Sequence, residues 1–207
     1  MMSTDPNEPK IGLVLLAAGG SRRLGKPKQT LSYHGESLLR RAAKAALASR
    51  CSKVAVVLGA HAEAFTSELE GLRLSTVNNP DWEEGVGSSI RVGITALNDA
   101  APELDAVLLA LCDQVLVEHR HLNSLVEAFC VFRPTVVASR YGDAFGAPAV
   151  FHHSLFADLA QLAGDQGAKK IILRHLESTV FVDIPEACMD IDTAGDYARL
   201  TSSPYNQ

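Results

Sequence analysis

Short apolar runs alternate along the chain with stretches of helical composition. Continuous aliphatic runs of about four to eight residues, bounded by turn-forming residues, are typical of strands that are buried on both faces of a sheet. Such runs predict strands over residues 11–17, 53–59, 72–77, 106–111, 135–139, 149–151 and 179–183. The first run, IGLVLLA, has no polar side chain, which indicates a strand covered on both faces.

The stretches between these runs predict helices. In residues 37–48, one stripe of a helix would carry the apolar residues Leu38, Leu39, Ala42, Ala43 and Ala46. Further helices are expected over residues 61–69, 88–97, 118–132, 154–162, 168–176 and 193–200. Strands that alternate with helices form a mostly parallel sheet with helices on both faces. The predicted fold class is therefore α/β, with a doubly wound sheet.

Length and composition limit the number of domains and the classes of partner. A chain of 207 residues suits one substantial core, and no linker or repeat divides it, so we predict one domain over residues 11–202 after a disordered lead-in over residues 1–10. The net charge of −5 favours neither nucleic acid nor a membrane surface as a partner. The scattered cysteines and the polar N-terminus, which lacks signal-peptide character, predict a cytoplasmic protein with reduced thiols.

The stretch LAAGGSRRLGKPKQ, residues 16–29, gathers basic side chains and glycines directly after the first predicted strand. Glycines let the backbone approach a phosphate closely, and the cations would neutralise its charge. The stretch fits a P-loop up to Pro27, where that pattern requires Ser or Thr. Proline has neither a hydroxyl for magnesium nor an N–H for a phosphate. The stretch therefore predicts a polyphosphate site of another kind, and the alternative is a solvated turn with surface cations.

Asp113 follows the buried run 106–111 and so lies at the same edge of the sheet as the glycine-rich stretch. A carboxylate in that place needs a cation, a donor or water. Mg²⁺ typically binds one or two carboxylates together with phosphate oxygens and water, so a metal between Asp113 and a phosphate is expected. Asp190 and Asp192 are candidates for a second carboxylate, although Asp192 would also suit the cap of the last helix.

Two further polar turns have both a functional and an ordinary interpretation. Within NNPDWEEGVGSS, residues 78–89, Asn79 would suit a base or ribose, or only its own turn. Ser88 and Ser89 would donate to a ligand or cap a helix. GDQGAKK, residues 164–170, is a glycine-bounded turn with cations beyond it, and an ordinary loop explains it equally well.

Together these motifs resemble a known family. LAAGGSRRLGKPK resembles the L-A-A-G-x-S-x-R-x-G-x-x-K signature of nucleotidyltransferases that activate cofactors and sugars. NPDWEEGVGSS, LCDQ, GAPAVF, GDQGAKK and DID then follow in the order found in the molybdenum cofactor cytidylyltransferase family, within the MobA-like NTP transferase superfamily. The resemblance extends from about Ile11 to Leu200. One departure is Val86–Gly87, which stands where the family commonly has Met-Ser or Met-Ala and bears on acceptor choice.

The resemblance implies a Rossmann-like nucleotidyltransferase fold that transfers CMP from CTP to the terminal phosphate of a molybdopterin-type cofactor and releases pyrophosphate. It implies Mg²⁺ as cofactor, an NTP and a phosphorylated pterin as partners, and a molybdoenzyme that receives the product. By motif position, catalytic roles fall to Arg22, Lys28 and Asp113, and metal binding falls to Asp113 and Asp192. Nucleotide binding falls to Ala17, Ala18, Gly19, Gly20, Ser21, Asn79, Ser88 and Ser89, and acceptor binding falls to Gln114 and Asp165.

Three other functions remain as alternatives. The first is a nucleotidyltransferase that acts on a sugar or polyol phosphate. The second is a non-catalytic nucleotide-binding chaperone that delivers a cofactor to a partner enzyme. The third is an NAD-type dehydrogenase, against which the missing G-x-G-x-x-G and the many cations of the glycine-rich stretch both argue.

Overall fold

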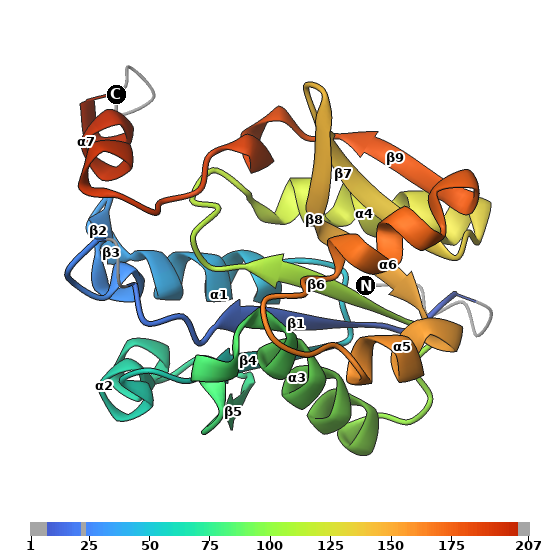
Figure 1. The fold of residues 1–207 in the computed structure, drawn as a ribbon, viewed down its shortest axis with the longest axis horizontal. Helices are drawn as coiled ribbons and strands as arrows, with labels where there is room; N and C mark the ends of the chain where they lie inside the picture. Colours follow the sequence, from blue (N-terminus) through green and yellow to red (C-terminus); the bar gives the residue numbers. More distant parts are fainter. Residues whose placement is uncertain (1–7, 22–23, 203–207) are drawn as a thin grey trace.

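A computed structural model describes residues 8–21 and 24–202 of the chain (Figure 1). Its centre is a seven-stranded sheet in the order β5-β4-β1-β6-β8-β7-β9. The strands are β1 (Ile11–Ala17), β4 (Lys53–Leu58), β5 (Ser75–Asn78), β6 (Ala106–Leu111), β7 (Val136–Tyr141), β8 (Ala144–His152) and β9 (Thr179–Asp183). Only β8 runs antiparallel to its neighbours, β6 and β7. The short strands β2 (Ser32–Tyr33) and β3 (Glu36–Ser37) form a separate hairpin.

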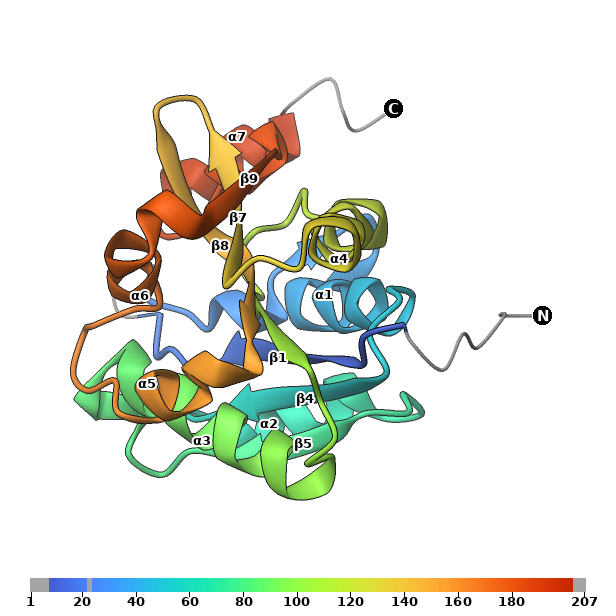
Figure 2. The ribbon, with the colours of Figure 1, turned by 90° about the vertical axis from the view of Figure 1, so that its right-hand side faces the viewer.

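Helices cover both faces of the sheet, as Figure 2 shows for α1 and α4 on one side and α3 and α5 on the other. The helices are α1 (Leu38–Leu47), α2 (Ala62–Thr66), α3 (Val86–Ala100), α4 (His119–Phe132), α5 (Phe156–Ala160), α6 (Lys169–Arg174) and α7 (Ala194–Ser202). The side chain of Ser37 accepts a hydrogen bond from the N–H of Arg40 and so caps α1. Every residue of β1 is buried, as its continuous apolar run predicts.

The predicted α/β fold with a doubly wound, mostly parallel sheet is confirmed. The strand predicted over residues 149–151 is wrong in length, because β8 spans Ala144–His152 and pairs with β7 as a hairpin. Gly146 and Pro148 interrupt its sequence pattern and concealed the first half of the strand. Strand β5 begins at Ser75 rather than at residue 72, and α3 begins at Val86 rather than at residue 88.

The structure describes residues 8–10, the last part of the predicted lead-in. The N–H of Lys10 donates to Asp105 Oδ2 at 2.8 Å, and its carbonyl accepts from the Asp105 N–H at 2.9 Å. Glu8 pairs with Arg50. Residues 8–10 therefore have defined positions, while residues 1–7 of the predicted lead-in lie outside the described residues. Within the described part of the chain, no helix is both long enough and apolar enough to cross a membrane.

Candidate active site

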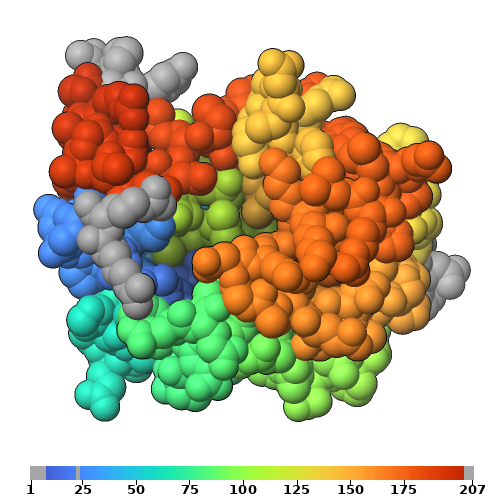
Figure 3. Space-filling view, in the orientation of Figure 1, coloured from blue at the N-terminus to red at the C-terminus, as the bar shows by residue number. Residues whose placement is uncertain are grey.

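The carboxyl ends of β1 and β6 open into a cavity of about 360 Å³. Its near wall consists of residues 16–20 with Lys28 and Gln29, and its floor of residues 111–113. Its far wall consists of residues 82, 83, 85, 86, 89 and 165. Figure 3 shows the molecule hollowed on this face, between the blue start of the chain, the red segment near residue 190 and the orange segment near residue 165. The two strand ends expected to carry functional residues thus meet at one cavity.

The near wall is built on the glycine-rich loop, residues 17–21. Ala17, Ala18, Gly19 and Gly20 all line the cavity, as a phosphate-binding loop requires. The side chain of Gln29 is completely buried behind this loop and donates to two of its carbonyl oxygens. The sequence offered no signal for this residue, because a buried glutamine has no hydrophobic pattern that separates it from a surface one. Arg22, the first predicted catalytic residue, lies outside the described residues.

A group of charges lies where β6 ends. Lys28 Nζ donates to Asp113 Oδ2 and lies 3.3 Å from Asp192 Oδ1. The N–H of Ile191 donates to the Asp113 carbonyl at 3.2 Å, which fixes the segment 190–192 beside the end of β6. The structure therefore brings together Lys28, Asp113 and Asp192, from three distant parts of the sequence.

The pKa values of this group follow from burial and charge. Burial would lower the pKa of Lys28, but the charge of Asp113 and the hydrogen bond to it raise that pKa above its ordinary value. Lys28 is therefore protonated at neutral pH. Burial, followed by the charges of Asp113 and Asp192, raises the pKa of Asp190 to about 6. Burial also raises the pKa of Cys112 to about 12, so this thiol on the cavity floor stays protonated and is no nucleophile.

The carboxylates fit a divalent cation. Asp113 Oδ1 is buried and has no hydrogen-bond partner among the described residues. The Lys28 ammonium pairs with both Asp113 and Asp192, so the two carboxylates lie close to one point. No group of three or more His, Cys, Asp or Glu side chains in the described ranges is arranged to hold a metal ion. Two carboxylates suit Mg²⁺ or Mn²⁺, which take the remaining ligands from phosphate and water.

Asn79 and Ser88 lie behind the far wall, and of the three predicted residues in this region only Ser89 lines the cavity. The Nδ2 group of Asn79 donates to the hydroxyls of Ser88 and Ser89 at 2.9 and 3.0 Å. Ser88 Oγ in turn donates to the Asp81 carbonyl at 2.9 Å. Asn79 and Ser88 are both fully buried, so in this structure they support the turn that leads into α3 and do not line the cavity.

The two predicted acceptor-binding residues lie in different places. Asp165 lines the far wall, whereas Gln114 is buried and donates from Nε2 to the carbonyls of Ala147 and Ala187 at 3.0 and 2.9 Å. Gln114 thereby joins the end of β6 to the C-terminal half of the fold. It does not line the cavity in this structure.

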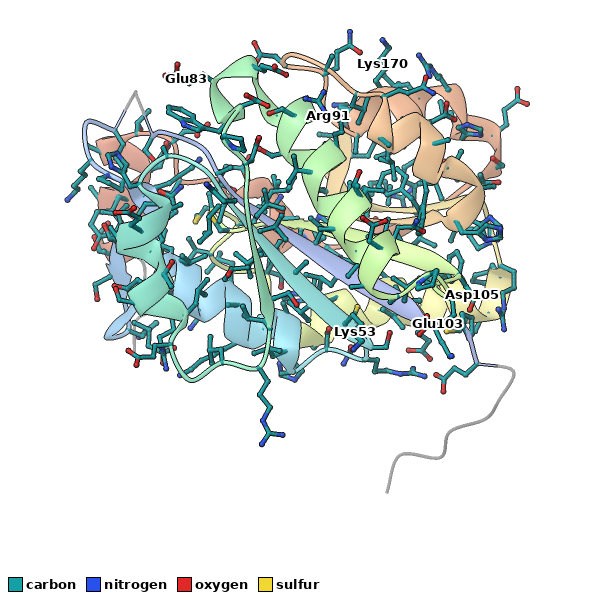
Figure 4. All side chains as sticks on the ribbon, turned by 90° about the horizontal axis from the view of Figure 1, so that it is seen from below. Lys53, Glu83, Arg91, Glu103, Asp105 and Lys170 are labelled. Carbon is teal, nitrogen blue, oxygen red and sulfur yellow. The ribbon has the colours of Figure 1, made fainter. Side chains whose placement is uncertain are left out.

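The loop that carries Asp165 lies against the start of α3. The N–H of Gly87 donates to the Gly164 carbonyl at 2.9 Å. Arg91 donates to the Leu162 carbonyl at 3.3 Å and pairs with Glu84 at 3.1 Å. Figure 4 shows Arg91 and Glu83 at this end of α3, opposite the end marked by Glu103 and Asp105. The start of α3 therefore positions Asp165 at the cavity.

Comparisons with known proteins show what this chain is similar to. Residues 13–179 match the family described as the MobA-like NTP transferase domain. Nicotine blue oxidoreductase of Paenarthrobacter nicotinovorans is 33% identical over 212 residues, which cover 95% of this chain and 98% of that protein. Purine catabolism protein PucB of Bacillus subtilis (strain 168) is 33% identical over 175 residues, covering 77% of this chain and 78% of that protein.

A solved structure shares the fold over nearly the whole chain. Rv0371c from Mycobacterium tuberculosis H37Rv matches with a TM-score of 0.82 at 30% identity, covering 94% of this chain and 98% of that one. A complex of Rv0371C with manganese matches with a TM-score of 0.77 at 28% identity, covering 94% of this chain and 99% of that one. A relative of the same fold has therefore been solved with a divalent cation.

Proposed function

We propose a specific nucleotidyl transfer for this chain, which belongs to the MobA-like NTP transferase family of nucleotidyltransferases. The reaction is the transfer of CMP from CTP to the terminal phosphate of a molybdopterin-type cofactor, with release of pyrophosphate. The observation that carries the proposal is one cavity in which a glycine-rich loop faces Lys28 and Asp113. The motif resemblance supports the pterin acceptor, and Ala18, which stands where the relatives that transfer GMP usually have glycine, supports CTP.

Each residue has a role that follows from its place. The backbone of residues 17–20, with Ser21, would hold the nucleotide and its phosphates, and Ser89 would contact it from the far wall. The Lys28 ammonium, together with Arg22, would stabilise the negative charge on the departing pyrophosphate. The attacking phosphate is ionised at neutral pH, so no general base is needed. Asp165 would face the acceptor.

Asp113 and Asp192 would hold Mg²⁺ or Mn²⁺ in this proposal. A bound divalent cation supplies positive charge that polarises the α-phosphate and neutralises the phosphate oxygens. The manganese complex of Rv0371C supports a divalent metal in this fold. A cytoplasmic location, where NTPs are available and thiols remain reduced, and delivery of the product to a molybdoenzyme belong to the same proposal.

The direct test is a screen for pyrophosphate release. Each of the common NTPs is combined with molybdopterin, a polyol phosphate or a hexose phosphate, with Mg²⁺, with Mn²⁺ or with EDTA. Release is expected with CTP and molybdopterin when a divalent cation is present. Release with a sugar or polyol phosphate alone would overturn the pterin acceptor, and CTP binding without any release would indicate a nucleotide-binding chaperone.

A second candidate is an oxidoreductase, because the Paenarthrobacter relative that matches 95% of this chain carries that name. Equilibrium titrations with NADH, NADPH and CTP separate the two functions. We expect binding of CTP and none of the reduced dinucleotides, since the loop lacks G-x-G-x-x-G. Binding of NADH or NADPH without CTP binding would exclude the nucleotidyl transfer.

A further inference from the structure

Gln29 lies directly behind the glycine-rich loop and uses both ends of its carboxamide there. Its side chain is 0% exposed. Nε2 donates to the Ala17 carbonyl at 2.9 Å and to the Gly19 carbonyl at 2.7 Å. Oε1 accepts a hydrogen bond from Ser21 Oγ at 3.3 Å. A single buried side chain therefore holds three points of one five-residue loop.

The direction of the loop's peptide groups follows from these contacts. The carbonyl of Ala18, between the two that Gln29 holds, accepts from the Ala60 N–H at 3.1 Å. In a planar trans peptide the N–H points opposite to the C=O. The N–H groups of Ala18 and Gly20, which follow the carbonyls of Ala17 and Gly19, therefore point away from Gln29. Among the described residues, the N–H groups of Gly19 and Gly20 find no acceptor. Both glycines line the cavity.

Ser21 completes the arrangement. Its backbone has a φ of 52°, in the left-handed region that a residue with a side chain seldom adopts. Its hydroxyl donates to Gln29 and accepts from the Lys28 N–H at 2.9 Å. These two hydrogen bonds stabilise the unfavourable turn and connect the glycine-rich loop to Lys28.

We infer that Gln29 is a positioning residue, which orients the N–H groups of Ala18 and Gly20 toward the phosphates of an NTP. The carboxamide of Gln29 itself hydrogen-bonds to the loop. The inference rests on the proposed function for the identity of the ligand, but the orientation of the loop depends only on the contacts of Gln29. Loss of the carboxamide would leave the carbonyls of Ala17 and Gly19 without this donor, the former in a buried position, and free the loop to rotate its peptides.

The test uses Trp82, the only tryptophan of the chain, as a reporter. A Cβ atom placed on Gly20 would lie 2.7 Å from Trp82 Cζ3, so the indole ring packs against the loop and its emission reports the loop position. Gln29→Leu keeps the size of the side chain and removes its donors. We expect a shifted Trp82 emission without ligand and a dissociation constant for CTP raised about tenfold. The KM for CTP should rise by the same factor while kcat at saturating CTP changes less.

Ser139→Ala is the matched control. Ser139 is fully buried in β7, and its hydroxyl donates to the Pro148 carbonyl at 2.6 Å, so the variant also leaves a buried carbonyl unpaired. We expect it to lower the Tm without changing Trp82 emission or CTP affinity. If Gln29→Leu behaves like this control, Gln29 has only a structural role and the inference is wrong. If the wild-type protein binds no NTP, the proposed function fails, and the emission of Gln29→Leu without ligand still decides the inference: a shift supports it and an unchanged spectrum overturns it.

Discussion

The two walls of the cavity differ in the contacts that hold their backbones in place. On the near wall, hydrogen bonds from Gln29 fix the backbone of the glycine-rich loop. On the far wall, a backbone hydrogen bond from Gly87 to Gly164 is accompanied by close backbone contact: a Cβ on Gly87 would lie 2.8 Å from the Ala163 nitrogen, and one on Gly85 would lie 2.5 Å from the Gly164 carbonyl oxygen. The near wall should therefore be sensitive to the loss of a polar group, and the far wall to the gain of a methyl group.

The largest effect is expected on the cavity floor, which both walls share. Asp113→Ala removes the carboxylate that pairs with Lys28 and that would hold the metal. We expect it to abolish metal-dependent pyrophosphate release, because charge stabilisation at the reacting phosphate would be lost. Asp183→Asn is the control, since Asp183 is an exposed carboxylate on β9 that pairs with Arg140. Full turnover by Asp113→Ala would disprove the proposed metal role.

Lys28→Met tests the charge on the near wall. The side chain keeps its length but loses the ammonium that lies between Asp113 and Asp192. We expect the rate of pyrophosphate release per folded molecule to fall on the order of 10²–10³, as for removal of one preorganised donor. The measurement is single-turnover release, with circular dichroism to count folded protein. A lower Tm with normal turnover would assign Lys28 a purely structural role.

Gly87→Ala tests the far wall at the point where this chain departs from the family pattern. The added methyl group would meet the backbone of Leu162 and Ala163 at 2.8–2.9 Å and displace the loop that carries Asp165. We expect the KM for the acceptor to rise roughly tenfold with little change in CTP affinity, since overpacking typically costs about 1–3 kcal/mol.

Gly167→Ala is the control for this variant. It adds a methyl group to the loop that carries Asp165, which faces the start of α3, but the nearest atom, Val86 Cγ1, lies at an ordinary 3.8 Å. We expect its kinetics to match those of the wild-type protein. If Gly87→Ala weakens CTP binding as much as acceptor binding, the two walls do not act separately and the comparison between them fails.

The sequence predicted the parallel half of the sheet well and the mixed half less well. Strands β1 and β6 read as uninterrupted apolar runs, so their ends, and with them Asp113, could be placed at one edge. Of strand β8 only residues 149–151 could be predicted, because Gly146 and Pro148 break its pattern and no local signal reveals antiparallel pairing. The order of the strands is a property of long-range packing, which periodicity does not encode.

The residues of the site were likewise predicted only in part. The family resemblance pointed to the backbone loop, Lys28 and Asp165, and all of them line the cavity. It could not distinguish a polar residue that faces a ligand from one whose partners are inside the protein. Asn79 and Ser88, for which both a ligand and a local structural role were open, hydrogen-bond to protein groups, and Gln29 was not predicted at all. Which way a polar side chain points depends on donors and acceptors brought together only by folding.

The smallest effect is expected far from both walls, at the start of α4. There His121 Nδ1 accepts a hydrogen bond from the Glu118 N–H at 3.0 Å, which requires a neutral ring. Burial lowers the pKa of His121, and the nearby Arg120 also lowers it, while Glu186, 3.6 Å from Nε2, opposes both. The folded-state pKa therefore lies below the unfolded value of about 6.5. The stability from this cap is complete above that pH and is lost as the pH falls below it.

His121→Gln should remove this pH dependence, because a glutamine can accept the same hydrogen bond without titrating. Between pH 7.5 and 5.5 we expect the Tm of the wild-type protein to fall by about 2 °C more than that of His121→Gln. CTP affinity per folded molecule should be equal in the two proteins, since His121 does not line the cavity. If the Tm of the wild-type protein and of His121→Gln depends equally on pH, His121 does not act as a neutral cap. A change in CTP affinity would mean that the cavity walls respond to the stability of α4. The contacts that hold each wall would then not make it independent of the rest of the fold.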